Sequence, residues 1–315
     1  MDIKKYFQDR VATLCMGIVL LCLLMTFIYP GQFATIPNFS QLLLNLSIDT
    51  IVAVGMMVLM IGGMFDLSVG SVVAFSGGLA GYLMYYEDVN FLVAVFAGIS
   101  GSVLIGLLNG LLIAKAGINP MIQTLAMMGV VRGAALMLSG AGIQNFPYEF
   151  TVIGQSRLSG LQAPVWYMIG IVALFSFLVN KTTFFRRYYF IGGNERAAKL
   201  SGIPVDKMKI AAFILSALLA GIAGILLSSR LGAALSTSGR GLELRVITAV
   251  ILGGASLSGG HGRITGAFLG ALFMALINNM LIIGRVSGYW QEIILGLVLI
   301  LAVGLDQWLQ RRTVK

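Results

Sequence analysis

Long apolar stretches alternate along the chain with short polar connections. The ten longest apolar segments hold roughly 15 to 24 residues each, close to the length at which a helix rising about 1.5 Å per residue crosses roughly 30 Å of hydrocarbon. Connections between them collect most of the charges and prolines. The pattern predicts an all-α integral membrane protein of about ten transmembrane helices, over residues 11–29, 43–64, 69–86, 91–114, 119–139, 164–180, 210–229, 244–258, 264–284 and 289–307.

Composition supports the same class. The chain is 58% hydrophobic and only 10% charged, whereas soluble domains are about 25% charged. No long polar stretch is present to form a separate soluble domain, so residues 1–315 are expected to form a single transmembrane domain. The sequence also shows no nucleophile–base set, and its one histidine, His261, stands alone in a glycine-rich turn. We therefore expect neither an enzyme nor a metal site.

The charges are distributed unevenly between the two sides of the predicted bundle. With ten spans, both termini fall on the same side as the segment 181–209, and Lys and Arg in excess mark the cytoplasmic side of a membrane protein. The net charge of +9 is therefore read as a topology signal and not as affinity for nucleic acid. Three basic residues are exceptions on the outer side: Arg157, Arg240 and Arg285. The basic residues on the predicted cytoplasmic side include Lys4, Lys5, Arg10, Lys115, Arg263, Arg311, Arg312 and Lys315.

The segment 181–209 is the most charged part of the chain and contains a well-defined short helix signal. Asn194 is a good N-cap, Gly202 suits the position after the helix end, and Pro204 follows as a stop. A helix is predicted over 195–201, with a favourable pair between Glu195 and Lys199 and a face of small side chains at Ala197, Ala198 and Ser201. Because so short a helix is unstable alone in water, a docked role is favoured over a solvated connection.

Two glycine-rich sequences resemble each other. Ile61-Gly-Gly-Met-Phe-Asp-Leu-Ser-Val-Gly70 is echoed by Leu252-Gly-Gly-Ala-Ser-Leu-Ser-Gly-Gly260, and each precedes a helix rich in glycine and alanine. Glycine-rich interruptions at corresponding places in two halves of a transporter point to broken helices along the transport pathway. In a chain with 40 glycines, a chance match is the alternative.

Polar side chains inside the predicted spans are few. Amides bind sugar hydroxyls as donors and acceptors, but they also join neighbouring helices. Asp66 could instead cap the third span. Arg132 is expected to snorkel or to pair with a carboxylate such as Asp49 or Glu243, with direct ligand binding as the alternative. Since no cluster of like charge is present, a neutral polar solute fits the pathway better than a bulky ion. The candidate pathway residues are Asn45, Asp49, Asp66, Ser68, Asn109, Gln123, Asn278 and Asn279.

Several motifs together resemble one family, the permease subunits of ABC importers for ribose, xylose, galactose or autoinducer-2. The resemblance covers roughly residues 40–305 and rests on Gly-Gly-Asn-Glu-x-Ala-Ala-x-Leu-Ser-Gly-Ile at 192–203, Asp-Leu-Ser-Val-Gly-Ser at 66–71, the segment 119–133 and Leu-Ser-Gly-Gly-His-Gly-Arg-Ile-Thr-Gly at 257–266. One departure is Met64-Phe65, where the family has a single Ile. The extra residue would turn Asp66 by about 100° in a continuous helix.

The resemblance implies several partners. A second permease subunit, identical or a paralogue, would complete a dimer in the bilayer of a bacterial inner membrane, and a periplasmic binding protein would deliver the solute. A separate cytoplasmic ATPase would use ATP and Mg²⁺, in keeping with the lack of a Walker A sequence here, and this chain would bind no cofactor. The ATPase-coupling helix would comprise Gly192, Gly193, Asn194, Glu195, Arg196, Ala197, Ala198, Lys199, Leu200, Ser201 and Gly202.

The expected function is thus that of a permease subunit in an ATP-driven importer of a monosaccharide or a similar neutral polar solute. Import of nucleosides or branched-chain amino acids by the same kind of transporter is one alternative. An ion-coupled secondary transporter working without an ATPase is another.

Overall fold

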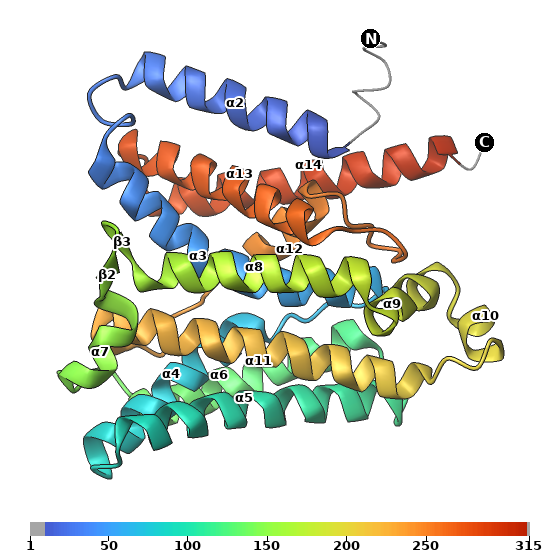
Figure 1. Ribbon diagram of the computed structural model, residues 1–315, viewed down its shortest axis with the longest axis horizontal. Helices are drawn as coiled ribbons and strands as arrows, with labels where there is room; N and C mark the ends of the chain where they lie inside the picture. Colours follow the sequence, from blue (N-terminus) through green and yellow to red (C-terminus); the bar gives the residue numbers. More distant parts are fainter. Residues whose placement is uncertain (1–9, 314–315) are drawn as a thin grey trace.

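The computed structural model describes residues 10–313, with side chains described for residues 11–304. Its main helices lie side by side, with α7 and the β2–β3 hairpin at one end of the bundle and α9 and α10 at the other (Figure 1). The predicted all-α class is confirmed. The predictions for Lys4, Lys5, Arg10, Arg311, Arg312 and Lys315 fall outside the described side chains. The helices are α2 (Arg10–Ile28), α3 (Ile36–Ile61), α4 (Val69–Tyr86), α5 (Phe91–Ala114), α6 (Pro120–Ser139), α7 (Tyr148–Gln155), α8 (Ala163–Lys181), α9 (Thr183–Gly193), α10 (Glu195–Leu200), α11 (Val205–Leu231), α12 (Leu242–Leu252), α13 (Ile264–Ile283) and α14 (Gly288–Thr313).

Seven of these helices are long and apolar enough to cross a membrane: α2, α3, α5, α6, α8, α11 and α13. The span predicted over 244–258 is not one continuous helix, because α12 has only 11 residues and reaches about 16 Å. Glycine-rich backbone without helical structure follows it, from Gly253 to Arg263. Helix α4 has 18 residues, and the apolar part of α14 is described over Gly288–Gly304.

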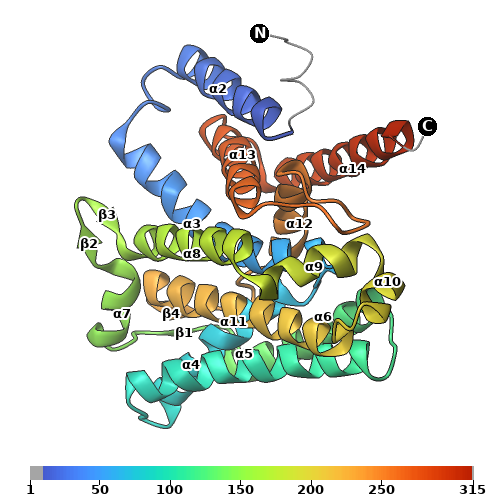
Figure 2. The ribbon, with the colours of Figure 1, turned by 45° about the vertical axis from the view of Figure 1, so that its right-hand side comes forward.

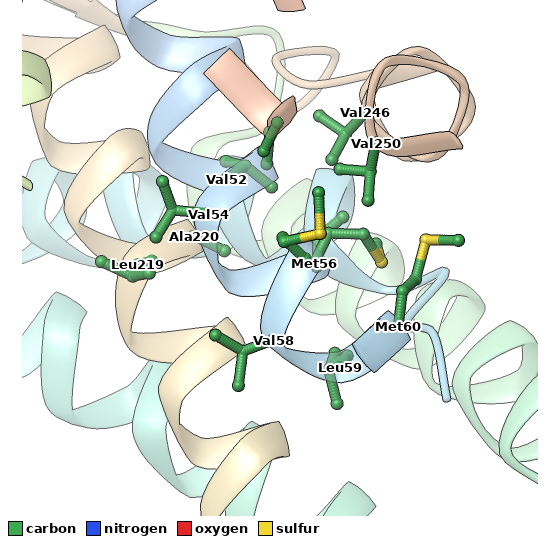
Figure 3. Packing of buried hydrophobic residues seen from close by; sticks show 14 of the residues in the cluster. Val52, Val54, Met56, Val58, Leu59, Met60, Leu219, Ala220, Val246 and Val250 are labelled. Carbon is green, nitrogen blue, oxygen red and sulfur yellow. The ribbon is translucent and has the colours of Figure 1, made fainter. Parts of the chain in front are cut away.

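Helix α3 is the centre of the bundle and is buried along most of its length. It starts at Ile36, earlier than the sequence predicts, because Thr35 accepts a hydrogen bond from the amide of Asn38 and a proline occupies the first turn. Figure 3 shows its side chains packed between α11 and α12. Close approach is aided by Gly55, where a Cβ would lie 2.9 Å from the Cα of Ser216 in α11.

The connection between α6 and α8 forms small elements at one end of the bundle. Strand β1 (Ile143–Gln144) pairs antiparallel with β4 (Ala233–Ala234), which follows α11. Strands β2 (Arg157–Leu158) and β3 (Leu161–Gln162) form a hairpin. The sequence correctly predicts that no apolar span lies between Ser139 and Ala163. Both described ends of the chain lie away from these elements, towards the end that carries α9 and α10 (Figure 1).

Candidate functional site

The two similar glycine-rich sequences form turns that lie against each other. Turn A (residues 62–68) links α3 to α4, and turn B (residues 253–263) links α12 to α13. The amide of Gly260 in turn B donates a hydrogen bond of 2.9 Å to the carbonyl oxygen of Ile61, the last residue of α3. Because turn A is not helical, the expected rotation of Asp66 by the extra residue does not apply.

Asp66 begins a buried polar chain that runs from turn A into α5 and α6. Its Oδ1 accepts hydrogen bonds from the amide of Ser68 at 2.8 Å and from the hydroxyl of Ser68 at 2.6 Å. The amide group of Asn109 donates to Ser68 Oγ at 3.2 Å, and that of Gln123 donates to Asn109 Oδ1 at 3.2 Å. The N-cap position of α4 is Ser68 rather than Asp66. The four predicted pathway residues of this buried polar chain thus form hydrogen bonds with one another and join turn A, α5 and α6.

A second polar group surrounds a cavity of about 440 Å³. Asn45 and Asp49 project from α3 and Asn278 from α13, so three of the predicted pathway residues meet here. Arg230, the penultimate residue of α11, donates to Asn45 Oδ1 at 3.1 Å. This polar cavity is lined by Asn45, Ile48, Asp49, Leu227, Arg230, Gly239, Leu242, Arg245, Asn278, Gly288, Gln291, Glu292 and Leu295.

An ion pair lies on the wall of the polar cavity. Arg245 of α12 lies with its Nε 3.4 Å from Asp49 Oδ2 of α3, and both side chains are partly buried. Sequence reasoning missed Arg245, together with Arg230, Gln291 and Glu292. A cation inside an apolar run is expensive unless it is paired or faces water, and that signal was available for Arg245. The cavity thus offers two carboxylates, two guanidinium groups and three amides, a set that can hydrogen-bond the hydroxyl groups of a neutral solute.

Asn279 lies next to Asn278 in sequence but has a different role. Its amide group donates to Asn38 Oδ1 at 2.7 Å and accepts from Asn38 Nδ2 at 3.3 Å. This reciprocal pair joins α13 to α3. Asn279 is therefore a link between helices, whereas Asn278 lines the cavity.

Arg132 does not pair with Asp49, which binds Arg245 instead. Its guanidinium donates to the carbonyl oxygens of Ser236 at 2.6 Å and Ser238 at 2.8 Å. These carbonyls belong to the irregular backbone between β4 and α12, where helical partners are lacking and buried polar groups need other donors. Glu243 Oε2 has no hydrogen-bond partner in the described part of the chain. Arg132 thus holds backbone rather than a carboxylate.

The predicted short helix is confirmed as α10. Asn194 Oδ1 accepts from the amide of Ala197 at 3.0 Å. At the other end, Gly202 has φ +80°, and the amides of Gly202 and Ile203 donate to Lys199 and Ala198, which is the Schellman arrangement. Glu195 does not pair with Lys199 but with Lys209 Nζ, at 2.7 Å.

The exposed face of α10 differs from the prediction. Ala198 is buried against the rest of the protein, so the proposed small-residue face is wrong for this residue. Contacts of α10 with α9 and α11 explain why. Around it, Arg196, Ala197, Lys199 and Ser201 are exposed, and Leu200 is 91% exposed. The outward surface is therefore an apolar tip flanked by positive charge.

His261 lies exposed in turn B. Across the described residues, no group of three or more His, Cys, Asp or Glu side chains is placed to hold a metal ion.

Comparison with known proteins places the chain in a family. Residues 38–303 match the family described as "Branched-chain amino acid transport system / permease component". The L-arabinose transport system permease protein of Escherichia coli (strain K12) is 40% identical over 90% of this chain and 87% of its own length. Ribose import permease proteins are 41% identical in Escherichia coli (strain K12), over 87% of each chain, and 37% identical in Bacillus subtilis (strain 168), over 93% of this chain and 91% of the relative. The chain is a multi-pass membrane protein and belongs to this family of transport permease components.

Proposed function

We propose that the protein is the permease subunit of an ATP-driven importer and that it carries a monosaccharide. The observation that carries this proposal is identity of about 40% to permeases named for L-arabinose and ribose, over nearly the whole chain. The polar cavity supports it, because its amides and paired charges suit a neutral solute rich in hydroxyl groups.

The proposed topology has ten membrane segments and both termini in the cytoplasm of a bacterial cell. To the seven long apolar helices it adds α4, α12 with its flanking irregular backbone, and α14. Two observations support this topology. Both described ends of the chain lie towards the end of the bundle that carries α9 and α10 (Figure 2). Lysine and arginine are abundant in the segment 181–209, which includes these two helices, as expected for a surface that faces the cytoplasm. The membrane would be the inner membrane.

Helix α10 is proposed as the docking element for a separate ATPase that holds ATP and Mg²⁺. Its apolar tip at Leu200 can enter a groove of the partner, while Arg196 and Lys199 can meet acidic groups at the rim. The caps at both ends stiffen this helix, so force applied at its tip reaches the segments on either side. A periplasmic binding protein and a second permease copy or paralogue complete the proposed complex.

The polar cavity is proposed as part of the solute pathway. Its volume of about 440 Å³ is large enough for a small polar solute, and Asn45, Asp49 and Asn278 lie on its wall. The buried polar chain of Asp66, Ser68, Asn109 and Gln123 is assigned a structural role instead, since its members bind one another.

The decisive experiment is uptake by the reconstituted complex. Proteoliposomes that contain this chain, its cognate ATPase and its cognate binding protein are expected to take up radiolabelled L-arabinose or D-ribose only with ATP inside. Uptake of leucine or adenosine in place of both sugars would favour the branched-chain amino acid or nucleoside alternative. Uptake by this chain alone, driven by an ion gradient, would overturn the ABC proposal.

Docking is tested by a charge at the tip of α10. Leu200→Asp should abolish co-purification of the ATPase while the permease remains folded, because the side chain is almost fully exposed. The matched control is Leu158→Asp, an exposed leucine in the hairpin at the opposite end of the bundle. Normal ATPase recovery with Leu200→Asp would refute the docking role of α10.

A further inference from the structure

Three segments that are far apart in sequence meet through their backbones at one point. Gly192, in the last turn of α9, packs against Gly259 and Gly260 of turn B and against the end of α3 with Gly63 of turn A. A Cβ on Gly259 would lie 2.7 Å from the Cα of Gly192 and 2.8 Å from the Cα of Gly63. We call these four residues (Gly63, Gly192, Gly259 and Gly260) the glycine junction.

At Gly192 and Gly259 the junction leaves no space for a side chain. A Cβ on Gly192 would overlap the carbonyl oxygen of Ile61 and the amide nitrogen of Gly260. Both are backbone atoms, so neither can move aside by a change of rotamer. Gly170 of α8 is a contrast, because nothing lies within 4 Å of the position its Cβ would take.

Hydrogen bonds tie the same segments together. Gly260 donates to Ile61, which joins turn B to α3. The hydroxyl of Tyr189 in α9 donates to the carbonyl oxygen of Gly262 at 2.8 Å, which joins α9 to turn B. Burial raises the pKa of Tyr189, with Arg263 acting in the opposite direction, so the hydroxyl keeps the proton that it donates. Hydrogen bonds therefore join turn B to both α3 and α9.

The helices that meet at the junction also meet at the polar cavity. Asp49 lies on α3 about 18 Å before Ile61, and its partner Arg245 lies on α12, which runs into turn B. Between these two points the helices pack through side chains such as Met56 of α3 and Val250 of α12 (Figure 3). α3 and α12 are thus linked to each other at the junction, along their length and at the cavity.

We infer that the glycine junction transmits the displacement of α9 and α10 to α3 and α12 together, and so changes the polar cavity further along these helices. This inference rests on the proposed function, in which the ATPase acts on α10. Close-packed backbone passes on even a small shift, since no flexible side chain absorbs it. Gly192 is accordingly a positioning residue, which contacts neither the ATPase nor the solute.

The test compares two helical glycines in the complete reconstituted transporter. With Gly192→Ala we expect normal co-purification of the ATPase but at least a tenfold loss in sugar taken up per ATP hydrolysed. Gly170→Ala in α8 is expected to stay within twofold of the unmodified protein, because nothing lies within 4 Å of its added Cβ. An unimpaired Gly192→Ala, an equal loss with Gly170→Ala, or a Gly192→Ala that simply fails to bind the ATPase would each overturn the inference.

A gentler pair of variants covers the case in which Gly192→Ala does not accumulate. Tyr189→Phe removes only the hydrogen bond to turn B and should lower uptake per ATP about threefold. The control is Tyr188→Phe, which removes the hydrogen bond of 3.0 Å to Met208 of α11 and leaves turn B attached. Equal uptake per ATP in both variants would contradict the junction's role. An unmodified complex that hydrolyses ATP but imports no sugar would count against the proposed function instead.

Discussion

The glycine junction and the polar cavity connect the same two helices by opposite means. At the junction, α3 and turn B meet through backbone atoms alone. At the cavity, α3 and α12 meet through the charged side chains of Asp49 and Arg245, with open volume beside them. The first contact depends on the absence of side chains, and the second depends on the charges of two side chains. The junction should therefore be sensitive to any added volume, and the cavity chiefly to changes in polarity.

The largest predicted effect is on the stability of the junction. Gly259→Ala places a Cβ at a residue with φ +85° and in contact with two glycine Cα atoms. Backbone strain of about 1–2 kcal/mol and overpacking of about 1–3 kcal/mol should add to a loss of about 2–5 kcal/mol. Thermal unfolding of the purified protein would measure it.

Gly241→Ala separates the two contributions. Gly241 has φ +71° but nothing within 4 Å of the position that an added methyl group would take, so only the strain of about 1–2 kcal/mol is expected. Equal destabilisation by the two variants would show that backbone strain, and not close packing, makes the junction sensitive.

The second prediction concerns the ion pair at the cavity. Asp49→Asn leaves the partly buried Arg245 without its nearest counter-charge, which should cost about 1–3 kcal/mol. The double variant Asp49→Asn with Arg245→Gln removes both charges and should be less destabilised than the sum of the two single variants. A double-mutant cycle of unfolding free energies measures this coupling. Strict additivity would mean that the pair contributes nothing to holding α3 against α12.

The third prediction compares two adjacent amides. Asn278→Leu should lower sugar uptake about threefold to tenfold, the equivalent of one hydrogen bond to the solute, with little change in stability. Asn279→Leu should instead lower the unfolding temperature, because it removes the reciprocal pair with Asn38. Uptake and thermal unfolding measured on both variants give the comparison. The reverse pattern would move the solute path away from the cavity.

The smallest predicted effect concerns the ion pair between α10 and α11. Glu195→Gln breaks the ion pair with Lys209, but the Glu195 side chain is about half exposed, so the loss should be less than about 1 kcal/mol. Chemical unfolding in detergent would detect a change of that size only as a slight shift. A loss as large as that of Asp49→Asn would show that the ion pair at α10 stabilises the protein as much as the ion pair at the cavity.

Local sequence signals predicted much of the fold. The apolar runs located the long helices, and Asn194 and Gly202 located both ends of α10, because capping depends on neighbours within a few residues. The inward orientation of Ala198 was not predictable in this way, since it depends on how α9 and α11 hold the short helix.

Contacts between distant segments account for most of the errors. Asp49 and Arg245 are 196 residues apart in sequence, and Arg132 reaches backbone 104 and 106 residues away. Residue type alone favoured a carboxylate partner for Arg132, but the irregular segment before α12 offers buried carbonyl oxygens instead. The division of the polar residues between the cavity and the buried polar chain also depends on helix rotation, which a single sequence with such weak periodicity does not define.

Because the glycine junction contains no side chains, it carries no information about the cargo. In the proposed complex, substitutions around the cavity would change which solute is recognised without any matching change at the junction. Selection would then act on the cavity and the junction separately. The same property makes the junction a poor place for gradual adaptation, since the smallest available substitution already adds a methyl group.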